Sequence, residues 1–217
     1  MKGNPPKLLG ADTNVGLDLA QGNEWVLDGM ATIRARLPNC SLLVPPTVSE
    51  ELAYLASYGE DEEERQATRE FLRRHRRWGF ELVNYVPSGS SFIQRIADRL
   101  RQSQLLPSEE MNDCFILAES AALGCSILLT SDEHLRGIDH ERLSFELGAF
   151  DVAVPLIATP REIVRKSSLL NSHCGADGMV KKAGDGPLSP AAFTARGFDT
   201  RTRQSDTGGR THRIVRD

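Results

Sequence analysis

The sequence lacks the features that mark membrane, secreted and zinc-binding proteins. No window of it reaches the roughly 18 uninterrupted apolar residues of a membrane-spanning helix. Its first residues, Met-Lys-Gly-Asn-Pro-Pro, lack the apolar segment of a secretory signal. The four cysteines lie far apart, and none forms a CxxC pair or a cluster with histidine. These absences argue against a membrane protein, a disulfide scaffold and a zinc finger, and they favour a cytoplasmic protein.

Positive charge is scarce in most of the chain. Residues 1–160 contain 15 Lys and Arg against 24 Asp and Glu, a net charge of −9, whereas residues 161–217 contain 11 against 6, a net charge of +5. A general electrostatic grip on nucleic acid needs Lys and Arg side chains that displace counterions from phosphates. Because residues 1–160 are acidic, a nucleic acid or other polyanion would have to bind through local basic patches, the C-terminal segment or bound cations.

Short apolar runs alternate with segments of helical periodicity along the first three quarters of the chain. The runs predict strands at residues 8–11, 41–44, 126–130 and 152–158, and residues 80–86 alternate between apolar and polar as a strand does. Helices are predicted at about residues 25–37, 47–56, 61–78, 91–105 and 107–124, followed by a short helix from 131 and a last one from 159. Strands separated by helices predict an α/β fold with a central parallel sheet.

The character of the sequence changes after about Lys166. Apolar residues become sparse, and Gly, Ser, Thr, Asp and Arg dominate without periodicity. We therefore expect a folded domain over residues 1–166 and a disordered, mildly basic tail over residues 167–217. The tail could assist RNA contact, but its composition is also that of a solvated segment without function.

Acidic residues follow several of the predicted strands. Asp12 and Asp132 each come directly after a strand, and Glu50 and Glu51 begin the helix after the strand at 41–44. Ligands of a parallel α/β sheet gather at the carboxyl ends of its strands. A fourth acid, Asp113, lies on the mostly apolar face of its helix, where a bare carboxylate is costly to bury.

No Lys or Arg lies within a turn of Asp12, Asp113 or Asp132. Converging carboxylates repel one another and favour a bound divalent cation, and ligand sets made only of oxygen favour Mg²⁺ or Mn²⁺. Each acid also has a simpler structural explanation. Asp12 could cap the helix that follows it, Ser131-Asp132 could supply a cap and a first-turn acid, and Thr47-Val48-Ser49-Glu50 has the spacing of a capping box. The capping box would leave Glu51 as the better candidate ligand, although Glu50 stays open.

These acidic segments also carry a resemblance to a known family. Residues 8–14, Leu-Leu-Gly-Ala-Asp-Thr-Asn, resemble the opening strand and acidic motif of PIN domains, metal-dependent ribonucleases that include the VapC toxins. Glu51-Leu52 is similar to the segment with the second acid of the family, residues 112–118 to the helix with the third, and residues 128–135 to the strand end with the fourth. The motifs occur in the order of the family across about residues 7–166.

The resemblance implies a fold, an activity and partners. The fold is a three-layer α/β/α PIN-like domain, and Asp12, Glu51, Asp113 and Asp132 would hold one or two Mg²⁺ or Mn²⁺ ions. Thr13 or Asn14, together with Ser131, would orient the carboxylates or meet the phosphate. The implied activity is endoribonucleolytic hydrolysis of RNA by a metal-activated water. The implied partners are an RNA substrate, a second copy of the chain in a homodimer and, for a toxin, a cognate antitoxin protein.

Two other readings of the sequence compete with a nuclease. A non-catalytic PIN-like module could bind RNA or protein through an arginine-rich helix end, at Arg69, Arg73, Arg74, Arg76 and Arg77, although such cations also suit any solvated helix C-terminus. A different phosphoryl-transfer domain of the haloacid dehalogenase type needs Asp-x-Asp after the first strand, and here Asn14 stands at the second position. The motifs GxxxxGK[ST], GxGxxG and GxSxG are absent, so nucleotide binding and acyl transfer lack support.

Overall fold

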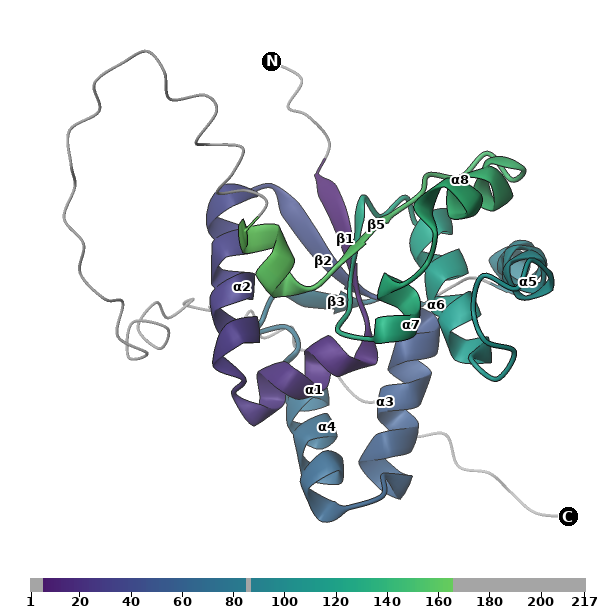
Figure 1. Cartoon of the computed structure of the whole chain (residues 1–217). Coiled ribbons are helices and arrows are strands. Elements are labelled where there is room, and N and C mark those ends of the chain that lie inside the picture. Colours follow the sequence, from purple (N-terminus) through teal and green to yellow (C-terminus); the bar gives the residue numbers. More distant parts are fainter. Residues whose placement is uncertain (1–5, 85–86, 166–217) are drawn as a thin grey trace, which may run out of the picture. The chain divides into compact units, whose positions relative to one another are not determined.

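Five parallel strands form the central sheet of the protein (Figure 1). The structure is a computed structural model that describes residues 6–84 and 87–165. The strand order is β3-β2-β1-β4-β5, with β1 in the middle paired to β2 at Leu9↔Leu42 and to β4 at Gly10↔Leu128. The strands are β1 (Lys7–Ala11), β2 (Cys40–Val44), β3 (Phe80–Leu82), β4 (Ile127–Leu129) and β5 (Leu156–Ala158). The predicted parallel sheet is confirmed.

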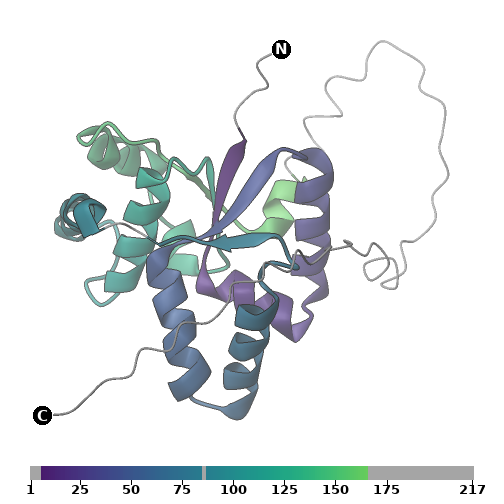
Figure 2. The same cartoon turned by 180° about the vertical axis from the view of Figure 1, so that it is seen from behind.

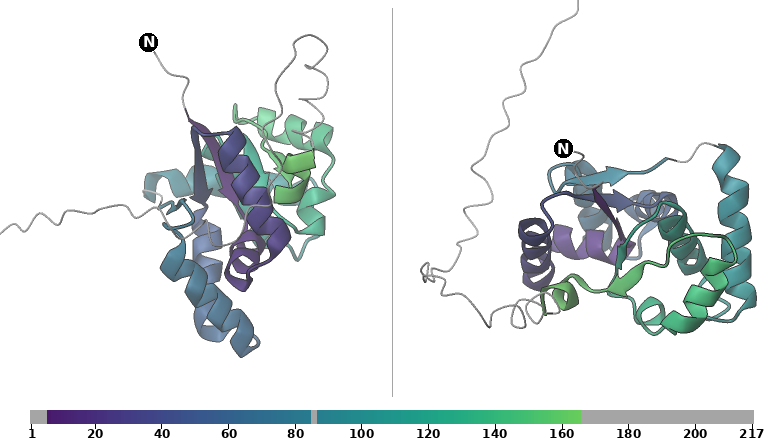
Figure 3. Two further views of the ribbon diagram at one scale, coloured as in Figure 1. Left: turned by 90° about the vertical axis from the view of Figure 1, so that its left-hand side faces the viewer. Right: turned by 90° about the horizontal axis from the view of Figure 1, so that it is seen from above.

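Helices cover both faces of this sheet, which gives the predicted three layers (Figure 3). One side carries α2, and the other carries α5, α6 and α8. The helices are α1 (Thr13–Gln21), α2 (Glu24–Arg36), α3 (Pro46–Tyr58), α4 (Glu62–Arg74), α5 (Pro87–Gln102), α6 (Met111–Ala122), α7 (Glu133–Arg136) and α8 (His140–Gly148), and residues 160–165 are also helical. None of the helices in the described ranges is long and apolar enough to cross a membrane.

The core lies between the sheet and its helical layers. Its fully buried side chains come from strands and helices alike and include Leu9, Leu52, Ile96, Leu117 and Leu129. Strands that are covered on both faces need nearly continuous apolar sequence, which is why these runs were recognisable.

Helices α3 and α4 pack side by side and project past the edge at which the strands end (Figures 1 and 2). Helix α4 begins at the Asp61 N-cap, whose side chain accepts a hydrogen bond from the Glu64 amide, 2.7 Å away. Near its C-terminus, the arginines at 73 and 74 both form ion pairs with Glu70. These pairs fit a solvated helix surface.

Several element boundaries differ from the sequence prediction. The helix predicted from residue 107 begins at Met111, because residues 107–110 form a turn closed by the Glu110 amide on the Pro107 carbonyl at 3.1 Å. The helix predicted to run to residue 78 ends at Arg74, and Gly79 at φ +70° turns the chain into β3.

All the described residues belong to one compact unit, Met1–Ala176. A second unit, Asp177–Asp217, and the predicted tail at residues 167–217 lie outside the described residues. Within the first unit, β1, β2 and β4 end at one edge of the sheet. The segments that follow these three strands contain three of the four predicted acidic positions.

Candidate active site

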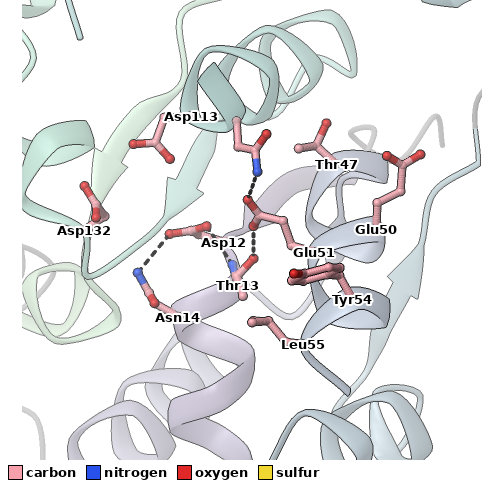
Figure 4. A pocket seen from close by; sticks show the side chains of 11 residues that line it. Asp12, Thr13, Asn14, Thr47, Glu50, Glu51, Tyr54, Leu55, Asp113 and Asp132 are labelled. Atoms are coloured by element: carbon pink, nitrogen blue, oxygen red, sulfur yellow. Dashed lines mark hydrogen bonds between the residues drawn. The ribbon is translucent and has the colours of Figure 1, made fainter. Parts of the chain in front are cut away.

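A pocket of about 510 Å³ opens at the carboxyl ends of β1, β2 and β4 (Figure 4). All four predicted acids line it, and Asn112 from α6 and Tyr54 and Leu55 from α3 complete much of its wall. None of the described residues that line it is Lys, Arg or His. The lining residues are Asp12, Thr13, Asn14, Thr47, Glu50, Glu51, Tyr54, Leu55, Asn112, Asp113 and Asp132.

Asp12 lies at the end of β1 and is 5% exposed. Its Oδ1 accepts a hydrogen bond from the Thr13 amide at 2.7 Å, so Asp12 is the N-cap of α1. Its Oδ2 accepts one from Thr130 Oγ1 at 2.7 Å and a longer one from Asn14 Nδ2 at 3.5 Å. Burial raises the pKa of Asp12 to about 6, although the Thr130 and Thr13 hydrogen bonds favour its charged form. Asp12 is thus both the expected cap and a member of the pocket.

Thr130, rather than the predicted Ser131, supports the carboxylates. Thr130 is fully buried, and its hydroxyl also accepts a hydrogen bond from the Asp132 amide at 2.9 Å. It therefore joins the end of β1 to the end of β4. Ser131 is exposed and lines a separate hollow together with Asp18.

Glu51 points toward the centre of the pocket, whereas Glu50 is exposed and points away from Asp12 (Figure 4). Glu51 Oε2 accepts a hydrogen bond from Thr13 Oγ1 at 2.5 Å, and its Oε1 accepts one from Asn112 Nδ2 at 2.5 Å. The expected role of Thr13 in orienting a carboxylate is present in this bond. Asn112 was not predicted, although it directly precedes Asp113 in the sequence.

Helix α3 is capped from another helix. The predicted capping box at residues 47–50 is wrong, because the helix begins at Pro46 and has no cap from its own side chains. Instead, Glu119 of α6 accepts hydrogen bonds from the Thr47 amide at 3.0 Å and from the Thr47 hydroxyl at 2.9 Å. Glu119 is 5% exposed, and burial raises its pKa to about 7. This contact fixes the start of α3, one turn before Glu51.

Asp113 lies in the first turn of α6 and is half-buried. Its Oδ2 is buried and has no hydrogen-bond partner among the described residues. Burial raises the pKa of Asp113 to about 7, and the charges of Asp12, Asp132 and Glu51 raise it further in the same direction. An unpaired buried carboxylate oxygen is costly unless a cation meets it.

Asp132 is the N-cap of α7. Its Oδ1 accepts hydrogen bonds from the His134 amide at 2.7 Å and the Leu135 amide at 3.1 Å. Its charge acts on both Asp12 and Asp113. The cap of α7 is therefore Asp132 itself, and not Ser131 with Asp132 in the first turn, and the same residue lines the pocket.

The carboxylates of the pocket are of the chemical type that binds a hard divalent cation, but they do not lie close enough together to form a complete coordination shell. Carboxylate oxygens are the ligands that Mg²⁺ and Mn²⁺ prefer. Among the residues that the structure describes, however, no three His, Cys, Asp or Glu side chains lie close enough to hold one metal ion. Like charges repel, and the hydrogen bonds from Thr13 and Asn112 hold Glu51 in its position. The site is a cluster of carboxylates in which the buried Oδ2 of Asp113 has no hydrogen-bond partner among the described residues.

Comparison with known proteins gives matches of fold only. No family model matches the chain, and no curated protein matches it in sequence. Among solved structures, it is similar to VapBC2 from Rickettsia felis bound to a DNA fragment from their promoter, with 13% identity, a TM-score of 0.48, and coverage of 70% of this chain and 98% of the other. It is also similar to VapBC-1 from nontypeable Haemophilus influenzae, with 16% identity, a TM-score of 0.45 and the same coverage.

Proposed function

We propose that this protein is a Mg²⁺- or Mn²⁺-dependent endoribonuclease of the PIN type. The observation that carries the proposal is the buried Oδ2 of Asp113, which has no hydrogen-bond partner among the described residues and faces a pocket that three further predicted acids line. None of the described residues that line this pocket is basic. A cation is the partner that such an oxygen lacks. Asp12, Glu51, Asp113 and Asp132 are the residues that would hold it.

Two of the carboxylates in the pocket, Asp12 and Glu51, are held by neighbouring side chains. Thr130 fixes Asp12 from the neighbouring strand, and Thr13 and Asn112 fix Glu51 from both sides. A bound Mg²⁺ or Mn²⁺ would activate a water molecule for attack on phosphorus and neutralise charge on the phosphate oxygens. The side chains around it hold the carboxylates in place, as outer-sphere groups do in metal sites generally.

A second candidate is a non-catalytic PIN-like module that binds RNA or protein. The spacing of the acids favours it, since no three of the described side chains are close enough to share a metal. The acidic lining of the pocket favours the nuclease, because a surface that binds RNA directly needs cationic side chains. The resemblance to the VapC toxins adds a cognate antitoxin and a homodimer to the nuclease proposal.

Cleavage of a mixed pool of structured RNA separates the two candidates. The full chain is incubated with Mg²⁺, Mn²⁺ or EDTA, and the wild type is compared with Asp113→Asn. Asparagine keeps the size of the side chain and removes its charge, so the fold is retained, which circular dichroism checks. We expect cutting that EDTA abolishes and that Asp113→Asn lowers by about 100-fold or more, since loss of an outer support alone typically costs 10- to 100-fold.

Two outcomes contradict the nuclease. Cutting that is insensitive to EDTA, or unchanged in the variant, would remove the role assigned to the carboxylates. Absence of cutting by folded protein in either metal would leave the binding module as the better description.

A further inference from the structure

Two exposed tyrosines stand beside the carboxylate pocket. Tyr54 and Tyr58 are 62% and 71% exposed, and their ring centroids lie 5.2 Å apart with an interplanar angle of 39°. Tyr54 lines the pocket, and its ring lies next to Glu51 and Thr13 (Figure 4). Exposed aromatic rings of this size cost free energy in water, so a pair of them at a pocket indicates a surface that binds something.

The two rings continue the pocket along α3. Tyr54 follows Glu51 by three residues and Tyr58 follows Tyr54 by four, so all three lie on one face of the helix. A nucleic acid strand with one phosphate at the carboxylates would therefore pass the Tyr54 ring next and the Tyr58 ring after it.

The charge of the pocket decides which part of a nucleic acid these rings can hold. The described lining residues include five acids and no Lys or Arg, so side chains there give a phosphate no attraction. Stacking of a base on an aromatic ring needs no charge and tolerates any base. It does need an unpaired base, because the faces of paired bases are already covered by their neighbours in the duplex.

We propose that Tyr54, supported by Tyr58, stacks an unpaired base of the RNA next to the scissile phosphate. This inference rests on the proposed function, which places that phosphate at the carboxylates. The two residues are recognition residues: they hold the base and leave bond cleavage to the acids.

Binding of a short fluorescein-labelled RNA, followed by fluorescence anisotropy, tests the proposal. All proteins carry Asp113→Asn so that cutting does not consume the probe, and Mg²⁺ is present. The probe is offered as a single strand and as a blunt duplex of the same sequence. Tyr54→Ala removes the ring, Tyr54→Phe keeps it, and Phe145→Ala removes a ring that is 75% exposed on α8 and does not line the pocket.

We expect Tyr54→Ala to raise the Kd for the single strand by about 5- to 100-fold, the usual effect of losing one stacked base. Tyr54→Phe and Phe145→Ala should stay within about twofold of their parent, and Tyr58→Ala should fall between them and Tyr54→Ala. The duplex should bind more weakly and be indifferent to Tyr54. A Tyr54→Ala protein that binds the single strand as well as its parent overturns the proposal, and the exposed rings would then belong to a contact with another protein.

The outcome of this test can be told apart from the outcome of the nuclease test. If wild-type protein never cuts RNA but Tyr54→Ala still loses single-strand binding, stacking stands and catalysis fails. If wild-type protein cuts RNA and Tyr54→Ala changes neither Kd nor KM, catalysis stands and stacking fails.

Discussion

At the residue scale, the four carboxylates differ in how the chain holds them. Asp12 and Asp132 are tied to backbone amides at the starts of helices, so their positions are set by the main chain. Glu51 is tied only to side chains, and Asp113 has one oxygen with no partner among the described residues. A bound cation would therefore have most effect on Asp113, whereas the hydrogen bonds from Thr13 and Asn112 already hold Glu51 in place.

The neighbouring acids Glu50 and Glu51 offer a matched pair of variants. Glutamine keeps the shape of the side chain and removes the charge. We expect Glu51→Gln to lower the Mg²⁺-dependent cleavage rate by about tenfold or more, because the pocket loses a charged donor next to Asp12. Glu50→Gln should stay within about twofold of wild type, because Glu50 is exposed and points away.

Initial rates on one RNA substrate, with melting temperatures to confirm folding, check this pair. An equal loss in both variants would mean that only the total negative charge matters. A loss confined to Glu50→Gln would reverse the assignment of the ligand.

The sequence was informative about which acids meet and less informative about what supports them. Asp12 and Asp132 could be predicted because all strands of a parallel sheet end at the same edge. Polar residues that directly follow such strands therefore lie close together. Thr130 and Ser131 could not be told apart, because the residue that points inward depends on where β4 ends, after Leu129. The partner of Glu51 on α6, Asn112, depends on where that helix begins, which the sequence placed four residues too early.

At the element scale, the contact between Glu119 and Thr47 fixes α3 against α6. Helix α3 starts at Pro46 without a cap from its own side chains, and the buried carboxylate of Glu119 accepts a hydrogen bond from the Thr47 amide instead. The same helix carries Glu51 and Tyr54 one and two turns later. The positions of Glu51 and Tyr54 therefore depend on a residue that does not line the pocket.

The pH dependence of stability tests this contact. Burial raises the pKa of Glu119 to about 7, from 4.5. A carboxyl whose pKa is raised on folding contributes stability that is fully present below its unfolded value and is lost as pH rises through its folded value. In metal-free protein, we expect the free energy of unfolding to fall between about pH 5 and pH 8, and Glu119→Gln to reduce that fall by about 1–3 kcal/mol.

Glu119→Ala separates the charge from the hydrogen bonds. Alanine leaves the Thr47 amide without its partner, which should cost about 1–3 kcal/mol at every pH. Urea unfolding at several pH values in EDTA measures both variants. A Glu119→Gln protein whose stability depends on pH as steeply as that of wild type would contradict the assignment, because Asp12 and Asp113 would then account for the whole effect.

Element boundaries were harder to predict than element types. Strand β5 was expected from residue 152 but begins at Leu156, because it pairs with β4 over only three residues. Helix α8 was missed because its buried face consists of Leu143 and Leu147 alone, and Phe145 between them is exposed. Two apolar residues four apart give too weak a period to separate a short helix from a loop.

At the scale of the whole molecule, charge is divided unevenly between the body and the C-terminal segment. The acidic pocket lies entirely within the Met1–Ala176 unit, whereas residues 177–217 contain 8 Lys and Arg against 5 Asp and Glu. If cations at the carboxylates and stacking on α3 hold the RNA, the basic segment is dispensable. If the segment holds the phosphates, its removal must weaken binding in a salt-dependent way.

A chain that ends at Ala176 distinguishes these two cases. We expect it to keep the Mg²⁺-dependent cleavage rate and the melting temperature of the full chain, because all four acids and all the described strands lie before that point. Each phosphate contact to a single strand contributes about −0.7 to the slope of log K against log salt concentration. We therefore expect the same slope for both chains, measured by anisotropy with the single-stranded probe. A slope that becomes shallower by about 2 or more on truncation would mean that the C-terminal segment meets several phosphates, and RNA recognition would then belong to it as well as to the pocket.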